Sequence, residues 1–403
     1  MSACRVCSGA VAEFLDLGDQ PLSDAFAREI GDEFCYRLRV GACADCAMVQ
    51  LLDEVPRERM FHREYPYRSS LSSVMRAHFA ELAKTLLANE LGGPDPFVVE
   101  IGCNDGVMLR TLAAEGIRHL GVEPSGDVAD VARSHGLTVR TAFFEADTAR
   151  RIAEESGPAD VVYAANTICH IPYIDSIFAG LDALLARDGV FVFEDPYLGD
   201  IIDRTSFDQI YDEHFYLFSV TTVAGMARWF GFELIDVERL PVHGGEVRYT
   251  VARAGRRQPT PAVDALLGEE RDRHLHTPGT LAGFAAAVRS NCTELTALLQ
   301  QLRADGKRVS AYGATAKSAT VINYAGIGPE LIDTVYDSTP EKQGRLTPGA
   351  HIPISSADHF REPYPDYALL FAWNHADEIL ERESGFRNSG GRWIVYVPRV
   401  TIL

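Results

Sequence analysis

The sequence has no long apolar run, few basic residues relative to acidic ones, and few cysteines for its length. Spanning a bilayer takes about 20 consecutive apolar residues, and no run among these 403 residues approaches that length. The formal net charge is −19, which argues against a general role on nucleic acid or membrane surfaces, because both need a positive field to pair with phosphate. The first residues also lack the charged and apolar regions of a secretion signal. A cytoplasmic protein without membrane or nucleic-acid partners is therefore expected.

The length and composition indicate a soluble protein of several domains. A chain of 403 residues is too long for one ordinary core, and 46% hydrophobic with 24% charged residues is typical of globular proteins. Segments rich in Gly, Pro or Arg interrupt the pattern at 92–96 and 253–261. We predict a monomer with domains at 1–72, 73–255 and 256–403.

Four of the eight cysteines stand in two close pairs, Cys4-x2-Cys7 and Cys43-x2-Cys46. Two such knuckles supply the four thiolates of a tetrahedral zinc site, and a site filled by four thiolates is closed and structural. The alternatives are a redox-active C-x2-C pair, which explains only one of the pairs, and an accidental cluster. The nearby Cys35 is expected to be a small buried apolar residue. The sequence therefore predicts structural Zn²⁺ in the first domain.

The order of the expected elements indicates an α/β protein. A helix is predicted over 72–90, and then strands alternate with helical stretches at 107–115 and 128–135. The strand candidates of this region are 97–101, 119–122, 161–164 and 190–193. Beyond 261, a helical region over 262–304 precedes a second unit, with a strand at 309–314, a helix through Lys317 and a strand at 331–337. The sequence thus predicts a small N-terminal zinc domain followed by two Rossmann-like halves.

The turn after the first of these strands carries glycines at positions that suit a cofactor. In Glu100-Ile101-Gly102-Cys103-Asn104-Asp105-Gly106 a buried strand ends in a turn with little side-chain bulk. Glu123 ends the next strand, where a carboxylate can accept hydrogen bonds from both hydroxyls of a ribose. This turn resembles the E-x-G-x-x-x-G signature of class I S-adenosyl-L-methionine methyltransferases.

The same turn differs from the G-x-G-x-x-G fingerprint of dinucleotide-binding proteins. Asn104 occupies the second glycine position and would crowd a pyrophosphate, which S-adenosyl-L-methionine lacks. The resemblance implies that Asn104 or Asp105 lies near the amino-acid end of the cofactor. It also places Asn166, just past the third strand, beside the sulfonium; the alternative for Asn166 is a helix N-cap.

The densest group of chemically active side chains is Tyr211-Asp212-Glu213-His214-Phe215-Tyr216. A histidine beside two carboxylates can be held in one tautomer with raised basicity, which suits a general base. Tyr211 could donate its hydroxyl to a developing oxyanion. The alternative is a solvated loop with one structurally bonded histidine.

Several motifs together resemble the sugar C-methyltransferases of antibiotic deoxysugar pathways over essentially the whole chain. They are Cys4-x2-Cys7, Leu15-Asp16-Leu17-Gly18-Asp19-Gln20-Pro21-Leu22, the turn from Glu100 to Gly106, Tyr211-Asp212-Glu213-His214-Phe215, His243-Gly244-Gly245 and Tyr312-Gly313-Ala314-x-Ala316-Lys317. The resemblance implies methyl transfer from S-adenosyl-L-methionine to C-3′ of a dTDP-4-keto-2,6-dideoxy sugar. In it His214 removes the C-3′ proton, Glu213 orients and tunes His214, and Tyr211 stabilises the enolate oxygen or positions the sugar.

Five further residues are candidates for the same site. His170 follows Asn166 by about one helical turn and is an alternative base, unless it is a helix-surface histidine. Tyr65 lies in the connector between the first two domains, where it could close over both ligands or only pack between domains. His243, Arg248 and Lys317 are candidate substrate contacts, and Lys317 follows a glycine turn at a helix N-terminus, where phosphate is favoured. Arg248 and Lys317 could equally be surface cations.

Other functions remain open at this stage. An O- or N-methyltransferase acting on a nucleotide sugar could use the same histidine, and methylation at C-5′ is another outcome. A chain that binds through its zinc domain and has lost catalysis is a third alternative, although the intact turn and Glu123 argue against it.

Overall fold

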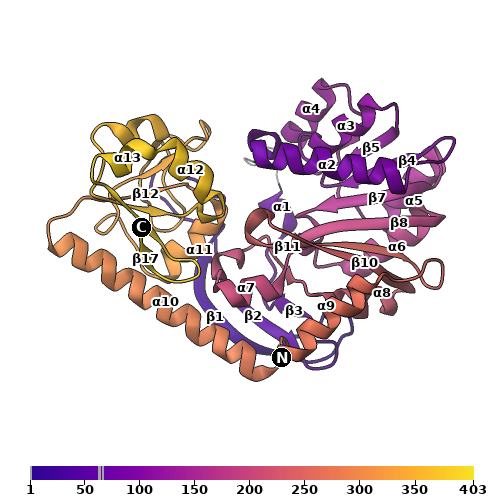
Figure 1. Ribbon diagram of the computed structural model, residues 1–403, viewed down its shortest axis with the longest axis horizontal. Helices are drawn as coiled ribbons and strands as arrows, with labels where there is room; N and C mark the ends of the chain where they lie inside the picture. Colours follow the sequence, from indigo (N-terminus) through magenta and orange to yellow (C-terminus); the bar gives the residue numbers. More distant parts are fainter. Residues whose placement is uncertain (1, 62–64, 66–67) are drawn as a thin grey trace.

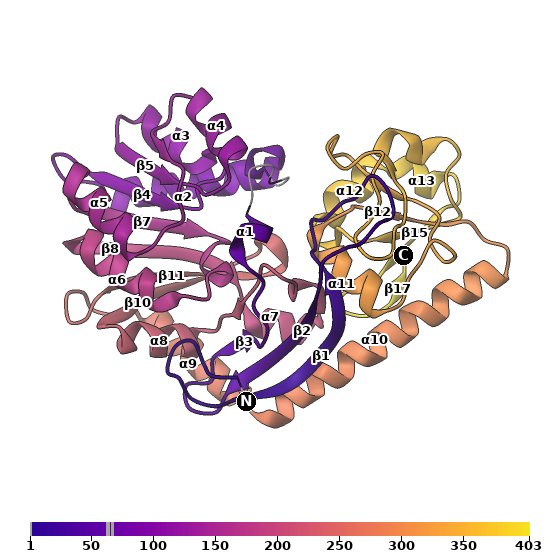
Figure 2. The same cartoon turned by 180° about the vertical axis from the view of Figure 1, so that it is seen from behind.

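The computed structural model describes residues 2–61, 65 and 68–403, and the strands in these segments form three sheets. Figure 1 shows the second and third sheets side by side, each with its own helices, with α10 beneath the third sheet and β1 and β2 curving below, between the two parts. Figure 2 shows the same arrangement from behind. Helices α10 and α11 both contact β1, so the first sheet touches the C-terminal part as well as the middle part.

The first sheet is antiparallel and joins two distant regions of the chain. In its order across the sheet, it consists of β1 (Val11–Pro21), β2 (Cys35–Cys43), β3 (Val49–Leu51) and β9 (Tyr216–Leu217). The short helix α1 (Arg57–Met60) follows it. Because β9 comes directly after the cluster predicted to be catalytic, strand pairing holds that cluster against the N-terminal part. The backbone N–H of Leu51 also donates to the carbonyl oxygen of Phe215 at 2.8 Å.

The second sheet has seven strands in the order β10-β11-β8-β7-β4-β5-β6, with β10 and β11 antiparallel to their neighbours. Its strands are β4 (Phe97–Ile101), β5 (Arg118–Val122), β6 (Val139–Arg140), β7 (Ala159–Ala165), β8 (Leu185–Pro196), β10 (Phe232–Leu240) and β11 (Glu246–Arg253). Its helices are α2 (Ser73–Asn89), α3 (Val107–Ala114), α4 (Gly126–Ser134), α5 (Ala146–Ser156), α6 (Ile174–Leu184), α7 (Leu198–Arg204) and α8 (Val220–Trp229).

Helices cover both faces of this sheet, so the central strand β4 is buried along its whole length. Along β4, Val98 packs in the cluster that includes α2 and α3, and Val99 packs in the cluster that includes α5 and α6. β4 lies between β5 and β7, where the order of the strands along the chain reverses direction across the sheet. In such sheets ligands bind at the carboxyl ends of the strands beside this reversal.

The third sheet, β14-β13-β12-β15-β16-β17, is parallel except for its last strand. Its strands are β12 (Val309–Tyr312), β13 (Val335–Asp337), β14 (Ile354–Ser356), β15 (Tyr367–Leu370), β16 (Arg392–Val395) and β17 (Thr401–Ile402). Its helices are α10 (Pro278–Ala304), α11 (Ala316–Tyr324), α12 (Ala376–Arg382) and α13 (Ser384–Asn388). The strand predicted over 331–337 is shorter than expected, because residues 331 and 332 turn back toward Gly328 through backbone hydrogen bonds.

The helical region predicted over 262–304 is two helices, α9 (Pro261–Asp272) and α10. The break follows from Thr277 and Pro278. The Thr277 hydroxyl accepts from the backbone N–H of Thr280 as an N-cap, and Pro278 has no N–H to continue an earlier helix.

The α/β class and the Rossmann-like second and third sheets confirm the predicted fold. In the described residues, no helix combines the length and apolarity needed to span a membrane.

Candidate functional site

The turn predicted to hold the cofactor joins β4 to α3 at the point where the strand order reverses. Gly102 and Gly106 have φ of +67° and +79°, a conformation that favours glycine. A Cβ at Gly102 would lie 2.4 Å from Oγ1 of Thr167, and one at Gly106 would lie 2.2 Å from a methyl group of Leu137. The two glycines therefore let the turn pack between the loop after β7 and the segment after α4.

Glu123, directly after β5, is tied to this turn by backbone hydrogen bonds. Its Oε2 accepts from the N–H of Asn104 at 3.0 Å and its Oε1 from the N–H of Ser125 at 2.8 Å. The side chain is buried, and burial raises the pKa of the carboxyl to about 7. Each oxygen keeps a second lone pair that can accept from a ligand hydroxyl.

A cavity of about 860 Å³ opens beside Glu123 and the turn. Gly102, Asn104 and Asn166, which the sequence predicts as cofactor contacts, line it together with Glu123. The apolar part of its wall comprises Phe61, Met75, Phe79, Ile101, Val122, Phe143, Phe144 and Ile171. Apolar walls with a carboxylate at one side suit a nucleoside whose base is buried and whose ribose is hydrogen-bonded.

Three other predicted cofactor residues do not line this cavity. Glu100 is buried within β4, Gly106 packs against Leu137, and Asp105 accepts a hydrogen bond from the N–H of Ser70 at 3.3 Å. Asp105 thereby ties the connector before α2 to the turn.

Tyr211 and His214 form a hydrogen-bonded pair. Nδ1 of His214 lies 2.7 Å from the carbonyl oxygen of Gln209, and Nε2 lies 2.8 Å from the hydroxyl of Tyr211. Because a carbonyl oxygen can only accept, Nδ1 carries the hydrogen and Nε2 accepts from the Tyr211 hydroxyl. The ring of His170 stacks on that of His214, with 5.2 Å between the ring centroids.

The prediction that Glu213 orients His214 is wrong, because Glu213 points to a different partner. Its Oε2 accepts a hydrogen bond from the hydroxyl of Tyr65 at 3.0 Å. Burial and the nearby Asp24 and Asp212 raise the pKa of the Glu213 carboxyl well above its ordinary value. The predicted raised basicity of His214 is wrong as well, since burial lowers its pKa well below 6.5. Burial thus favours the neutral form of both side chains.

His170 completes this cluster. Burial lowers its pKa to about 3, and its Nε2 has no hydrogen-bond partner among the described residues. The structure therefore places three neutral, polar rings within a few ångströms of one another: those of His170, Tyr211 and His214.

A second and larger cleft, about 1670 Å³, lies between the middle and C-terminal parts. Tyr211, Glu213, His214 and Lys317 line it. The residues that line both this cleft and the first cavity are Tyr65, Met75, Asn166, His170 and His243. The two spaces therefore adjoin at the predicted catalytic cluster.

Of the three predicted substrate contacts, two line the spaces and one does not. His243 lies at the junction of the two spaces, and Nζ of Lys317 donates to the carbonyl oxygen of His243 at 3.3 Å. Arg248 lines neither space. The register of β11 sets it opposite Glu194 of β8, and its Nε donates to Oε1 of Glu194 at 2.6 Å.

Three cations that line the large cleft were not predicted from the sequence: Arg68, in the connector before α2, and Lys342 and Arg382 from the C-terminal part. Nζ of Lys342 donates to the carbonyl oxygen of Ala314 at 2.8 Å, and Arg382 ends α12. None of the three stands in a motif, and they come from separate parts of the chain. No local signal in the sequence points to them.

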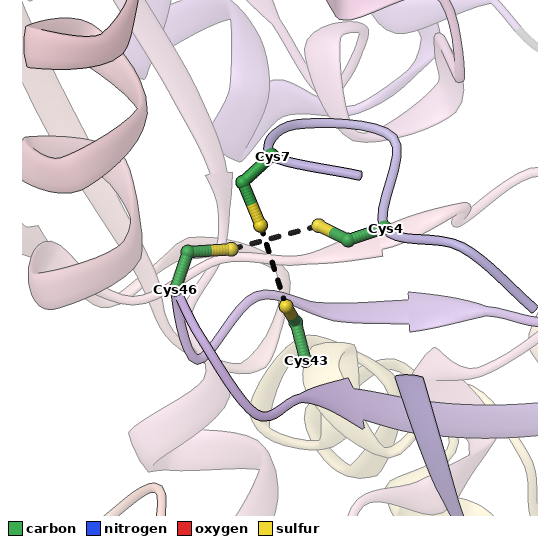
Figure 3. A group of neighbouring side chains, drawn as sticks. All are labelled: Cys4, Cys7, Cys43 and Cys46. Carbon is green, nitrogen blue, oxygen red and sulfur yellow. Dashed lines mark hydrogen bonds between the residues drawn. The ribbon is translucent and has the colours of Figure 1, made fainter. Parts of the chain in front are cut away.

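The four paired cysteines meet at one end of the first sheet (Figure 3). Cys4 and Cys46 have their sulfurs 3.5 Å apart, as do Cys7 and Cys43, and all four sulfurs lie within 4.8 Å of one another. Zinc with bonds of about 2.3 Å to four thiolates needs sulfurs about 3.8 Å apart. The cluster therefore has the donors and spacing of a structural zinc site. Cys35, by contrast, is exposed rather than buried, because only β1 pairs with that end of β2.

Comparisons with known proteins agree along the whole chain. Three family models match in succession: "Putative zinc binding domain" over residues 4–61, "Methyltransferase domain" over 67–237 and "C-methyltransferase C-terminal domain" over 241–398. The C-methyltransferase NovU of Streptomyces niveus is 33% identical over 408 residues, which cover 99% of this chain and 96% of NovU.

Other likenesses are partial. A ubiquinone biosynthesis O-methyltransferase of Actinobacillus pleuropneumoniae is 30% identical over 102 residues, 24% of this chain and 44% of that protein. Among solved structures, the PH0226 protein of Pyrococcus horikoshii covers 47% of this chain and 97% of its own, with 17% identity and a TM-score of 0.38. The assignment rests on NovU, whose match spans nearly all of both proteins: the chain belongs to the family of C-methyltransferases that includes NovU.

Proposed function

We propose that the protein uses S-adenosyl-L-methionine to methylate C-3′ of a dTDP-4-keto-2,6-dideoxy sugar, with or without a 3-amino group, in deoxysugar and antibiotic biosynthesis. The observation that carries the proposal is the junction of two spaces at Asn166, His170 and His243, with the Tyr211–His214 pair beside it. A methyl donor and a separate acceptor can then meet at one point. The likeness to a C-methyltransferase over the whole chain supports carbon as the acceptor atom.

The smaller cavity is the one that suits the methyl donor. Glu123 would accept hydrogen bonds from the ribose hydroxyls, and Asn104 and Asn166 would contact the amino-acid end and the sulfonium side. When bound, S-adenosyl-L-methionine supplies an electrophilic methyl group to a carbon nucleophile. The Cys4, Cys7, Cys43 and Cys46 cluster lines neither space and would hold Zn²⁺ in a structural role.

His214 is the base in the proposed reaction. A 4-keto group acidifies the hydrogen on C-3′, so a neutral imidazole can remove it as a proton. Nε2 of His214 is the nitrogen without a hydrogen, and it accepts the proton once the Tyr211 hydroxyl turns from Nε2 to the sugar. Glu213 and Tyr65 hold each other at the edge of the same space. His170 remains the alternative base.

The nucleotide end of the substrate belongs in the outer part of the larger cleft. Lys342 and Arg382 line it, and two cations suit a diphosphate despite the acidic net charge of the chain.

Exchange of hydrogen for deuterium tests the proposal directly. In deuterated water, without methyl donor, the enzyme is expected to exchange the C-3′ hydrogen of a dTDP-4-keto-2,6-dideoxy sugar, as followed by NMR. A C-methyltransferase that forms an enolate catalyses this exchange, whereas an O- or N-methyltransferase does not. His214→Asn should reduce the exchange by at least about 100-fold while S-adenosyl-L-methionine still binds.

Two further outcomes separate the remaining alternatives. With donor present, mass spectrometry and NMR of the product place the new methyl group on C-3′, on C-5′ or on a heteroatom. Absence of S-adenosyl-L-methionine binding in calorimetry would favour a non-catalytic binding protein and contradict the proposal.

A further inference from the structure

The ammonium group of Lys317 lies inside the large cleft, close to the catalytic cluster. Lys317 is the second residue of α11, and its side chain is partly buried, with its ammonium near His214, His243 and Asp208. Among the described residues, its one hydrogen bond runs from Nζ to the carbonyl oxygen of His243. An ammonium has three N–H donors, so two remain for a ligand in the cleft that Lys317 lines.

The charge of Lys317 is only partly balanced by its neighbours. The nearest acids are Asp208 and Glu246, and both are buried. Burial raises the pKa of both carboxyls, which favours their neutral forms, and Oδ2 of Asp208 already accepts from Trp373 and Tyr396. Burial also lowers the pKa of Lys317 from 10.5. An anion beside this ammonium would therefore be strongly stabilised.

The position of Lys317 favours the reacting end of a substrate over its phosphate end. Nζ of Lys317 donates a hydrogen bond to the backbone of His243, which lines the donor cavity as well as the large cleft. The positive charge of Lys317 also lowers the pKa of His214. Arg68, Lys342 and Arg382 are the other cations of the cleft among the described residues, and none of them lines the donor cavity. Lys342 and Arg382 also bond no described residue that lines it. The prediction of a phosphate contact therefore suits these two residues better than Lys317.

We propose that Lys317 donates a hydrogen bond to the C-4′ oxygen of the keto sugar and stabilises the enolate, so that the C-terminal part supplies the hydrogen-bond donor to the developing oxyanion. The inference rests on the proposed function. The C-3′ hydrogen leaves as a proton to the base, its electron pair forms the C-3′–C-4′ double bond, and the carbonyl pair moves onto the oxygen. Lys317 keeps its proton throughout. In methyl transfer the oxygen pair would re-form the carbonyl and the C-3′–C-4′ pair would form the new bond to the methyl carbon. The bond from that carbon to sulfur would break with its electron pair left on sulfur, so that the donor leaves as S-adenosyl-L-homocysteine.

The test is exchange of the C-3′ hydrogen in deuterated water, measured without methyl donor at saturating sugar. Removing one donor to an oxyanion typically costs about 10²–10³-fold in rate, and Lys317→Met is expected to lower the exchange rate by that factor. Calorimetry with dTDP alone, which has no ketone, should give a Kd within about twofold of the unsubstituted protein, because each lost charged contact would cost about tenfold or more. Lys342→Met is the positive control for weakened dTDP binding, and Lys307→Met makes the same change at an exposed lysine of the third domain.

The outcomes separate this inference from the proposed function. If the unsubstituted protein exchanges and Lys317→Met exchanges at a similar rate while losing dTDP affinity, Lys317 is a phosphate contact and the inference fails. If the unsubstituted protein does not exchange, both proposals fail. Thermal unfolding checks each variant. Should Lys317→Met not fold, Lys317→Arg keeps the charge but displaces the donor, and undiminished exchange in it overturns the inference.

Discussion

At the residue scale, burial sets the charge of the groups around the two spaces. Burial raises the pKa of Asp212 to about 7 and that of Glu213 well above its ordinary value, while it lowers the pKa of His170 to about 3. The sequence predicts two carboxylates beside a basic histidine at this position. In the folded protein, burial favours the neutral form of each of these groups. A neutral imidazole and a cationic Lys317 are the states that enolate chemistry requires.

The affinity for S-adenosyl-L-methionine is expected to rise with pH up to about 7. Burial puts the pKa of Glu123 in the free protein at about 7. Ribose hydroxyls donate to the ionised carboxylate, so binding lowers this pKa and releases a proton. As the pH rises toward 7, the Kd should therefore fall by up to about tenfold per pH unit. Above pH 7 the Kd should stay constant.

Calorimetry between pH 5.5 and 8 measures this dependence. Glu123→Gln has no proton to release and should bind more weakly with a flat profile. An equal slope in both proteins would show that another group is responsible.

At the scale of elements, the two cysteine pairs meet where β1 begins and β2 ends. Cys4 and Cys7 precede β1, Cys43 ends β2, and Cys46 lies in the turn before β3. Four bonds to one metal ion would join the segment before β1 to the turn between β2 and β3 and would so stabilise this end of the sheet.

Cys43→Ser is expected to lower the zinc content below one ion per chain and to destabilise the protein by on the order of 4 kcal/mol, as is typical when a structural metal is lost. Elemental analysis and thermal unfolding measure the two effects. The matched control is Cys35→Ser, which changes an exposed cysteine of the same sheet outside the cluster. A zinc-free Cys43→Ser protein with full stability and activity would contradict the structural role.

At the scale of the whole molecule, all three parts hold the segment 207–216 that carries Tyr211 and His214. From the first part, the N–H of Ser23 donates to Asp212 at 3.1 Å. From the third part, the hydroxyl of Thr320 donates to the carbonyl oxygen of Ile210 at 2.8 Å, and Tyr396 donates to Asp208 at 2.7 Å. The geometry of the catalytic pair therefore depends on the assembled molecule.

Tyr396→Phe should lower kcat by about tenfold with little change in KM, because it loosens the segment without touching the cleft. It should also cost about 1–2 kcal/mol of stability, since it removes a buried hydrogen bond to a carboxyl group. Steady-state kinetics and chemical denaturation measure both quantities. Ser310→Ala removes a part-buried hydrogen bond to Asp333 in the third part of the chain and should cost less stability, with unchanged kcat. Equal kcat values in the two variants would contradict the positioning role of Tyr396.

The sequence by itself determined the features that depend on local chemistry. The glycines of the 102–106 turn, Glu123 at the end of the next strand and the two cysteine pairs are set by residue type and spacing, because a turn or a knuckle involves only a few consecutive residues. The alternation of strands and helices around them followed from apolar periodicity in the same way.

Only the tertiary structure decided which side chains meet across long separations. Glu213 and His214 are adjacent in the chain yet take different partners, Tyr65 and Tyr211, because the loop turns their side chains apart. Arg248 is drawn to Glu194 by strand register, and Lys317 reaches the catalytic cluster because α11 packs against the segment that carries it. Such contacts depend on how separate elements pack, and local spacing carries no information about that packing.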